Sequence, residues 1–288
     1  MQNMRDIKRR IGSFKNMRQI TKAMEMVAAA KLRRSQEAAE SSRPYVEKLR
    51  EVIGSVAGAA QDVKHPMLIS RTVKKTAYLV ITSDRGLAGG FNTNLLRHLV
   101  RTLDERHQSR DEYGIFVVGR KGRDFLKRRK FPIIEEVTGL PDSPEFSDIK
   151  RIASRAVEQY AEETFDELYL VYNEFINPVT QRPVEKRLLP LADLEQGEKS
   201  AGNTFYEYEP SAEEVLSVLL PRYAETLVYS ALLESKASEF GARMSAMSNA
   251  TDNASDLIDS LTLQYNRARQ ASITQELSEI VAGANALN

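Results

Sequence analysis

The fold of this chain depends on residues 240–275, whose sequence is FGARMSAMSNATDNASDLIDSLTLQYNRARQASITQ. Eleven of its positions follow one another at alternating steps of four and three: Phe240, Met244, Met247, Thr251, Ala254, Ile258, Leu261, Tyr265, Ala268, Ser272 and Gln275. This spacing, kept over five heptads, is typical of a helix that presents one seam to a partner helix. Because no proline follows Pro221, the pattern predicts one helix from about Pro221 to Ala284.

The predicted length of this helix limits where it can lie. At a rise of about 1.5 Å per residue, it measures about 95 Å from end to end. A compact domain formed by a chain of 288 residues is far narrower than that. We therefore expect the C-terminal helix to project from the rest of the protein.

The N-terminal segment predicts a partner helix, because apolar residues recur every three or four positions in residues 2–60. A first seam consists of Met4, Ile7, Ile11, Phe14, Met17, Ile20, Met24 and Val27, and a second consists of Val46, Leu49, Ile53 and Val56. Two successive steps of three between Phe14 and Ile20 predict a stammer, which overwinds a coiled coil locally. Pro44 predicts a kink or bend between the two seams.

Between these helices the sequence changes to short apolar runs separated by turn residues. Strands are predicted at residues 78–82, 115–118, 168–172 and 184–191, and helices at residues 91–106, 121–129 and 147–165. Strands that alternate with helices form βαβ crossovers and a largely parallel sheet. The predicted fold class is α/β: a Rossmann-like domain of residues 75–195, with helices in residues 1–60 and 210–288 that pair as a long antiparallel coiled coil.

The composition argues against several classes of protein. There are 41 Lys and Arg against 40 Asp and Glu, a formal net charge of +1, which argues against a general nucleic-acid binder. Cys is absent, and the three His (His65, His98 and His107) are scattered, so we expect no catalytic, metal or cofactor site. No apolar run approaches the roughly 18 residues of a membrane span, and no signal-peptide core follows Met1. We expect a soluble, intracellular protein that does not insert into a membrane.

The near-zero net charge hides two ends of opposite sign. Residues 1–34 contain ten basic and two acidic side chains, whereas residues 234–288 contain seven acidic and four basic ones. A basic helix is explained equally well by a solvated surface and by contact with an acidic partner. The charges alone leave both explanations open.

Four segments of the chain have more than one interpretation. Residues 82–90, TSDRGLAGG, lie where a phosphate-binding loop would, but the glycines do not fit G-x-G-x-x-G and there is no Walker loop, so a tight turn is favoured. Residues 119–130 form the densest basic cluster, and a solvated helix face is favoured over phosphate or nucleic-acid binding.

The small and short polar residues 249–255, NATDNAS, lie in the middle of the predicted C-terminal helix and have two interpretations. Either their small side chains allow a second helix to approach closely, or they form a polar face that slides past changing neighbours. Residues 264–276 are polar all round, which suits a helix with several neighbours.

The segments ITKAMEMVAA (residues 20–29), SDRGL (83–87), NATDNA (249–254) and RARQASITQEL (267–277) resemble signature sequences of one family, the γ subunits of rotary F-type ATP synthases. The resemblance extends over essentially the whole chain, and its two terminal motifs are specific to that family. It implies a central rotor shaft inside a ring of three α and three β subunits. The foot of the shaft would rest on the ε subunit and on the membrane ring of c subunits.

The resemblance also implies a mechanism and a set of contact residues. Proton-driven rotation of an asymmetric shaft would change which β conformation is favoured, and so couple rotation to ATP synthesis or hydrolysis without a catalytic site in this chain. Contacts with acidic segments and loops of β are implied for Lys22, Met24, Arg269, Gln270, Thr274 and Glu276. The foot is implied for Tyr206, Tyr208 and Glu209, and the tip in an apolar sleeve of the ring for Ile280, Val281 and Leu287.

The absence of Cys excludes the regulatory thiol pair of the chloroplast branch of this family. A start at Met1 without an organelle-targeting leader favours a bacterial source over a mature mitochondrial form. We therefore expect a peripheral protein on the cytoplasmic face of the bacterial plasma membrane. Two other classes remain as alternatives: a nucleotide-dependent enzyme that binds phosphate at residues 86–90, and a static coiled-coil scaffold.

Overall fold

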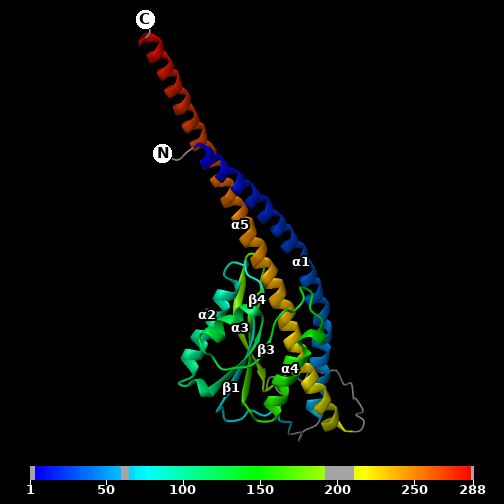
Figure 1. The fold of residues 1–288 in the computed structure, drawn as a ribbon. Coiled ribbons are helices and arrows are strands. Elements are labelled where there is room, and N and C mark those ends of the chain that lie inside the picture. The colour runs from blue at the N-terminus through cyan, green and yellow to red at the C-terminus, as the bar shows by residue number, and fades with distance from the viewer. Residues whose placement is uncertain (1–3, 60–64, 192–210, 287–288) are drawn as a thin grey trace. The chain divides into compact units, whose positions relative to one another are not determined.

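The computed structural model describes residues 4–59, 65–191 and 211–286 (Figure 1). The chain forms two compact units, which we call the helical unit (residues up to Ala28 and from Met244 onward) and the α/β unit (Ala29–Arg243). Helix α1 (Met4–Ala59) and helix α5 (Ala212–Ala286) each contribute to both units. The boundary between the units therefore runs through both helices, and the division into segments 1–60, 75–195 and 210–288 stays a prediction.

A five-stranded sheet forms the centre of the α/β unit, in the order β3-β2-β1-β4-β5. Its strands are β1 (Thr76–Ile81), β2 (Tyr113–Val118), β3 (Ile133–Val137), β4 (Glu167–Phe175) and β5 (Gln181–Leu189). β1 pairs in parallel with β2 and β4, β2 pairs in parallel with β3, and β4 and β5 form an antiparallel hairpin. The prediction of an α/β fold with a mostly parallel sheet and long terminal helices is confirmed.

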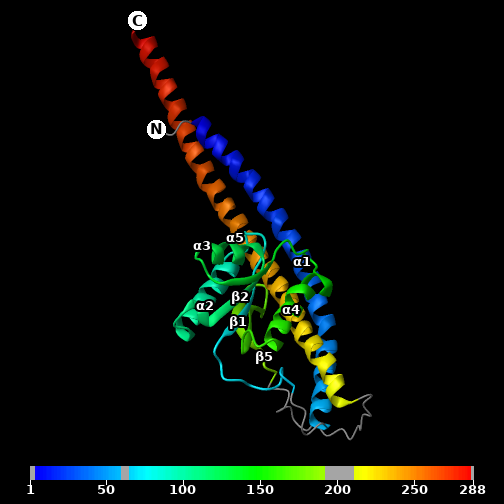
Figure 2. The ribbon, with the colours of Figure 1, turned by 60° about the horizontal axis from the view of Figure 1, so that its bottom comes forward.

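Helices cover both faces of this sheet (Figures 1 and 2). Between the strands lie α2 (Phe91–Arg106), the short 3₁₀ helix η1 (Arg110–Glu112), α3 (Arg120–Arg128) and α4 (Phe146–Ala161). Leu95 and Leu126, from α2 and α3, are buried in a core on one face together with Val80. On the other face α4 packs with the α/β-unit parts of α1 and α5, where Ile53 and Leu220 are fully buried. Burying such a side chain stabilises the fold by about 1.5–3 kcal/mol.

Strand β3 was not among the predicted strands, because its sequence, IIEEV, has no continuous apolar run. It lies at the edge of the sheet, where charged side chains are tolerated. Glu135 forms an ion pair with Arg151 at 3.3 Å, and Glu136 forms one with Lys127 at 2.7 Å. These ion pairs from α4 and α3 explain how two carboxylates fit into a half-buried strand.

In the α/β unit, α1 lies antiparallel to α5. Lys31 of α1 lies over the ring of Phe240, 5.9 Å from its centroid, whereas Val56, further along α1, is buried in the same core as Leu216 near the start of α5. The second predicted seam is confirmed, because Ile53 and Val56 are buried and Val46 and Leu49 pack against them. Pro44 does not interrupt α1, which continues through it.

In the helical unit, α1 presents a regular seam without a stammer. Ile7, Thr21 and Ala28 are buried there, Ile11 and Phe14 are half-buried, and the steps between these residues continue one heptad register. The prediction that Met17, Ile20 and Val27 lie in the seam is wrong, because their side chains are 48%, 60% and 53% exposed. Apolar side chains do not mark this seam throughout, because after Phe14 the polar Thr21 and the small Ala28 occupy it.

The seam of α5 contains small residues at the matching level. The hydroxyl oxygen of Thr21 lies 2.8 Å from that of Thr251, and Thr251 also donates a hydrogen bond to the carbonyl of Met247 at 2.8 Å. Ala254 is buried, whereas Asp252 and Asn253 are exposed. These contacts support the first interpretation of residues 249–255, in which small side chains allow the two helices to approach closely.

The corrected register predicts unequal effects on stability for substitutions at two neighbouring residues. Replacing Ala28, which is 1% exposed, by Leu adds volume to a filled seam and should lower the free energy of unfolding by about 1–3 kcal/mol. Val27→Ala, on the exposed face, should change it by no more than about 0.5 kcal/mol. Urea unfolding followed by circular dichroism measures both, and a larger loss for Val27→Ala would restore the register with the stammer.

Candidate functional site at the unpaired end of the C-terminal helix

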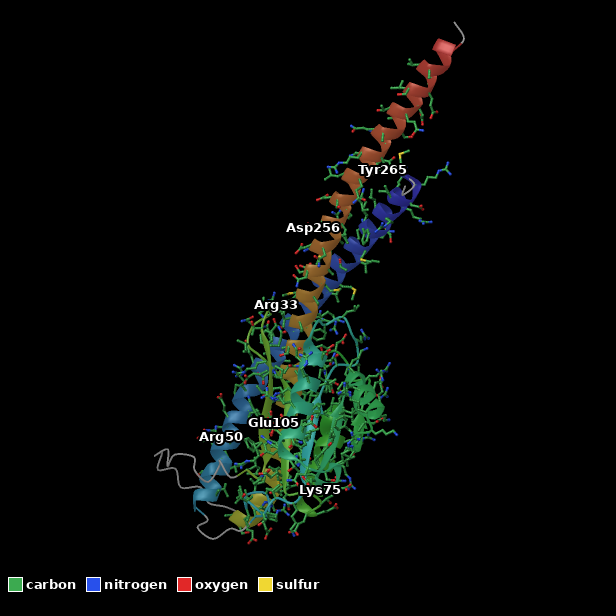
Figure 3. All side chains as sticks on the ribbon, turned by 90° about the vertical axis from the view of Figure 1, so that its left-hand side faces the viewer. Arg33, Arg50, Lys75, Glu105, Asp256 and Tyr265 are labelled. Atoms are coloured by element: carbon green, nitrogen blue, oxygen red, sulfur yellow. The ribbon has the colours of Figure 1, made fainter. Side chains whose placement is uncertain are left out.

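The seam of α5 fades toward the C-terminus of the helix. Ile258 and Leu261 are buried, Tyr265 and Ala268 are half-buried, and beyond Ala268 every side chain up to residue 283 is exposed except the half-buried Ser272. Tyr265 lies level with the N-terminal end of α1 in Figure 3. The predicted seam continues in the sequence past this level, but the described part of the chain provides no partner for it.

Four of the predicted contact residues lie on this unpaired end. The guanidinium of Arg269 and the amide of Gln270 make no hydrogen bond or ion pair with any described residue. Glu276 accepts only a hydrogen bond from the hydroxyl of Ser272, at 3.4 Å, and the side chain of Thr274 is exposed. The structure thus brings these residues onto one short stretch of helix and leaves their polar groups available.

Apolar side chains also line this end of α5. Ile273, Leu277, Ile280 and Val281 are all exposed, at steps of four, three and one that place them on one side of the helix. A single exposed apolar side chain is ordinary, but a stripe of four indicates a surface that contacts another molecule. Of the predicted tip residues, Ile280 and Val281 belong to this stripe, and Leu287 lies outside the described residues.

The two predicted contact residues of α1 lie in the helical unit as well. Lys22 is exposed and forms an ion pair with Glu25 at 3.1 Å, and Met24 is half-buried. On the same helix, Lys8, Arg10, Lys15 and Arg18 have no acidic partner among the described residues.

The exposed Met17, Ile20 and Val27 add apolar area to α1, on a different side of the helix from Lys8 and Lys15. They were missed as surface residues because they were assigned to the seam. If the heptad register of Ile7, Ile11 and Phe14 is continued through the polar positions that follow, these three apolar residues fall outside the seam.

The same combination of sequence and fold occurs in known proteins. The sequence model of the family described as ATP synthase matches residues 3–287. The ATP synthase gamma chain of Brevibacillus brevis is 64% identical over 282 residues, which are 98% of this chain and 98% of that protein. The chain belongs to the ATP synthase gamma-chain family.

Solved structures related to this gamma-chain family member have the same fold. The mitochondrial ATP synthase central stalk and c-ring structure of Tetrahymena thermophila contains a chain with a TM-score of 0.63 and 30% identity, over 80% of this chain and 99% of that chain. Two Euglena gracilis mitochondrial ATP synthase structures, one of OSCP, F1 and c-ring and one of the rotor, match with TM-scores of 0.66 and 0.61. At 22% and 21% identity, over 99% and 94% of this chain and 94% and 98% of theirs, they show the shared fold alone.

The predicted foot residues of this gamma-chain family member, Tyr206, Tyr208 and Glu209, lie outside the described residues. Within the described ranges, no helix has an apolar stretch long enough to cross a membrane. In the same ranges, no three acidic or His side chains are grouped so as to bind a metal ion.

The loop at residues 82–90 is closed by its own hydrogen bonds. The Ser83 amide donates to the side chain of Asn92 at 3.0 Å, and the Asn92 amide group donates to the Ser83 hydroxyl at 2.8 Å. The carboxylate of Asp84 accepts from the backbone amide of Arg120 at 2.9 Å, at the first residue of α3. A nucleotide loop at residues 82–90 would hold its phosphate at the N-terminus of the helix that follows β1, which is α2. Asp84 instead caps the neighbouring helix α3 and ties the loop to it.

Gly119 is the glycine that this arrangement requires. Its φ is +95°, and a Cβ atom there would lie 2.2 Å from the carbonyl oxygen of Thr82. Gly119→Ala should therefore lower the free energy of unfolding by about 3 kcal/mol or more.

Gly139 is the matched control for this substitution, because its φ is +80° but a Cβ atom would meet nothing within 4 Å. Gly139→Ala adds backbone strain without a clash and should cost about 1 kcal/mol. Equal urea midpoints for the two variants would show that the close approach of Gly119 to Thr82 does not make a side chain at position 119 destabilising.

Proposed function

We propose that this chain is the central rotor shaft of a proton-transporting ATP synthase and that it has no catalytic site of its own. In this proposal it turns inside a ring of three α and three β subunits, and its foot binds the ε subunit and the c-ring. It binds no nucleic acid and does not insert into the membrane. The observation that supports the proposal best is the exposed end of α5, where Arg269 and the stripe from Ile273 to Val281 lack any described partner.

The proposed mechanism is mechanical, and it depends on the different faces of the shaft. In the helical unit α1 has free cations and exposed apolar residues on different sides. The end of α5 has exposed polar groups and an apolar stripe. Each β subunit of a threefold ring meets a different face, so its open and closed conformations gain different contact free energies. Moving such an equilibrium from 1:99 to 99:1 requires a difference of about 5.5 kcal/mol, and rotation supplies it to one β subunit after another.

Specific contacts follow from the exposed groups. Arg269, Gln270, Thr274 and Glu276 contact loops of β in this proposal, and Lys22 and Met24 lie where the basic surface of α1 meets acidic β segments. Charge-assisted hydrogen bonds to a partner are worth about 1.5–3 kcal/mol each. The apolar tip, with Ile280, Val281 and Leu287, is held by an apolar sleeve at the top of the ring.

The foot and the location of the complex complete the proposal. Tyr206, Tyr208 and Glu209 contact the ε subunit and the c-ring, and the chain lies on the cytoplasmic face of the bacterial plasma membrane as a peripheral subunit. The close similarity to a gamma chain of a Brevibacillus species supports the bacterial assignment.

Arg269→Ala should reduce ATP-driven proton pumping by the assembled complex about tenfold, because the guanidinium can then no longer bind a β loop. The fold of the chain itself should not change, since this side chain makes no described contact. Arg267→Ala removes an exposed positive charge two residues away and serves as the control. The role of Arg269 is rejected if both variants pump like the unmodified complex, or if Arg269→Ala lowers the urea midpoint of the isolated chain.

Met24→Lys should lower the number of protons pumped per ATP hydrolysed, because it adds a charge beside Lys22 at the proposed β contact. Ala23→Lys adds the same charge at a neighbouring exposed position and should have a smaller effect. Proton pumping and ATP hydrolysis measured on the same vesicles give the ratio. An unchanged ratio in Met24→Lys would argue against coupling through this part of α1.

A further inference from the structure

We propose that the α/β unit contains a binding pocket for a compact phosphate anion at the carboxyl edge of its parallel sheet. A cavity of about 520 Å³ lies there, and its charged lining consists of Asp84, Arg85, Arg120, Asp142, Lys236 and Glu239. The pocket is independent of the rotor contacts, all of which are proposed for other residues.

The cavity lies outside the carboxyl ends of three parallel strands. β1, β2 and β3 end at Ile81, Val118 and Val137, and three segments of the lining follow directly after these strands. α5 closes the remaining side with Lys236 and Glu239. In open α/β sheets, ligands bind outside the carboxyl ends of the strands, usually at the topological switch point, which here lies between β1 and β4. The cavity shares this edge of the sheet but lies on the β1, β2 and β3 side of the switch point.

Every carboxylate of the lining is already compensated. Asp84 accepts hydrogen bonds from the backbone amides of Arg120, Gly139 and Leu140, at 2.9, 3.0 and 3.1 Å. Asp142 accepts one from the ammonium of Lys31 at 2.5 Å. Glu239 accepts one from the guanidinium of Arg243 at 2.8 Å. The pocket therefore has little negative charge left to repel an anion.

The cations of the lining, in contrast, have donors to spare. The side chain of Lys236 is only 8% exposed, and its one hydrogen bond, to Glu239, is 3.5 Å long. The guanidinium groups of Arg85 and Arg120 have no hydrogen bond or ion pair with any described residue. A buried ammonium with so weak a partner is costly, and an anion in the pocket would remove that cost.

The charges around the cavity match a doubly charged anion. Lys31 and Arg243 join the three cations of the lining, so five positive groups surround three carboxylates and two positive charges are in excess. Burial alone would raise the pKa of Asp142, but its hydrogen bond with Lys31 and the charges of Lys31, Arg85 and Lys236 hold that pKa below its ordinary value. The positive charges of Arg85 and Lys236 therefore both reach Asp142, in the lining of the cavity. Near neutral pH inorganic phosphate is a mixture of monoanion and dianion, and the excess positive charge of the lining suits both.

The lining favours a compact anion over a nucleotide. None of the residues that line the cavity is aromatic, so the pocket offers no surface on which a base could stack. Asp84 accepts the backbone amide at the N-terminus of α3, so this donor is already used. What remains free are the side-chain donors of Arg85, Arg120 and Lys236, which suit the oxygens of one phosphate group.

Calorimetric titration of the full chain tests the proposal, with inorganic phosphate, pyrophosphate and ADP as ligands and chloride used to keep the ionic strength constant. We expect saturable binding of one phosphate per chain, about tenfold weaker in Arg85→Ala and in Arg120→Ala. Both residues are exposed, so neither change should prevent folding. Arg128→Ala removes an exposed, unpaired cation of α3 outside the lining and should leave the affinity unchanged.

Three results would overturn the proposal. The first is the absence of saturable phosphate binding up to millimolar concentrations. The second is an equal loss of affinity in Arg128→Ala and in the two pocket variants, which would indicate a general charge effect. The third is tighter binding of ADP than of pyrophosphate, which would show that the pocket recognises a nucleoside and not a compact anion.

Discussion

The pairing of α1 with α5 is the constraint on which the functional surfaces of this chain depend. In the helical unit the two helices meet through small residues, with the Thr21 and Thr251 hydroxyls 2.8 Å apart and Ala28 and Ala254 buried. Because this seam keeps one heptad register, it directs Ile20 and its apolar neighbours outward. It also ends near the first turn of α1, so the described side chains of α5 beyond Ala268 are exposed, apart from the half-buried Ser272.

The α/β unit uses its polar groups mainly to hold itself together. Asp84 fills the N-terminus of α3, and the hydrogen bonds of Ser83 and Asn92 close the loop in which a related fold would hold a nucleotide. In this unit α1 and α5 are also joined to the sheet edge, since Lys31 binds Asp142 and Arg243 donates to the carbonyl of Gly86 at 3.1 Å. These contacts hold the loop after β1, helix α3 and the two long helices together at one edge of the sheet.

Much of the fold could be predicted from the sequence, because the buried strands of the parallel sheet are continuous apolar runs and the seam of α5 is strictly periodic. Strand β3 was missed since its glutamates are neutralised by lysine and arginine from other helices, which no local pattern reveals. The seam of α1 was misplaced at Met17, Ile20 and Val27 because burial there depends on the shape of the partner helix and not on hydrophobicity. The polar segment 264–276, which contains Arg269 and Gln270, was marked by its own sequence as a helix with several neighbours. A role for these two residues in contacting β was implied only by the resemblance to a family, since an exposed polar residue does not reveal its partner in one sequence.

The claim that this chain turns inside a ring of subunits is tested most directly by stopping the rotation. The chain has no Cys, so Ile20→Cys introduces a single thiol on the exposed face of α1, where pairing with α5 prevents the helix from uncoiling freely. Oxidation would then link it to a cysteine placed in a facing β subunit of the assembled complex. We predict that ATP turnover stops when this disulfide forms and returns when it is reduced. Full turnover with the disulfide intact would contradict the rotor function and favour a static scaffold.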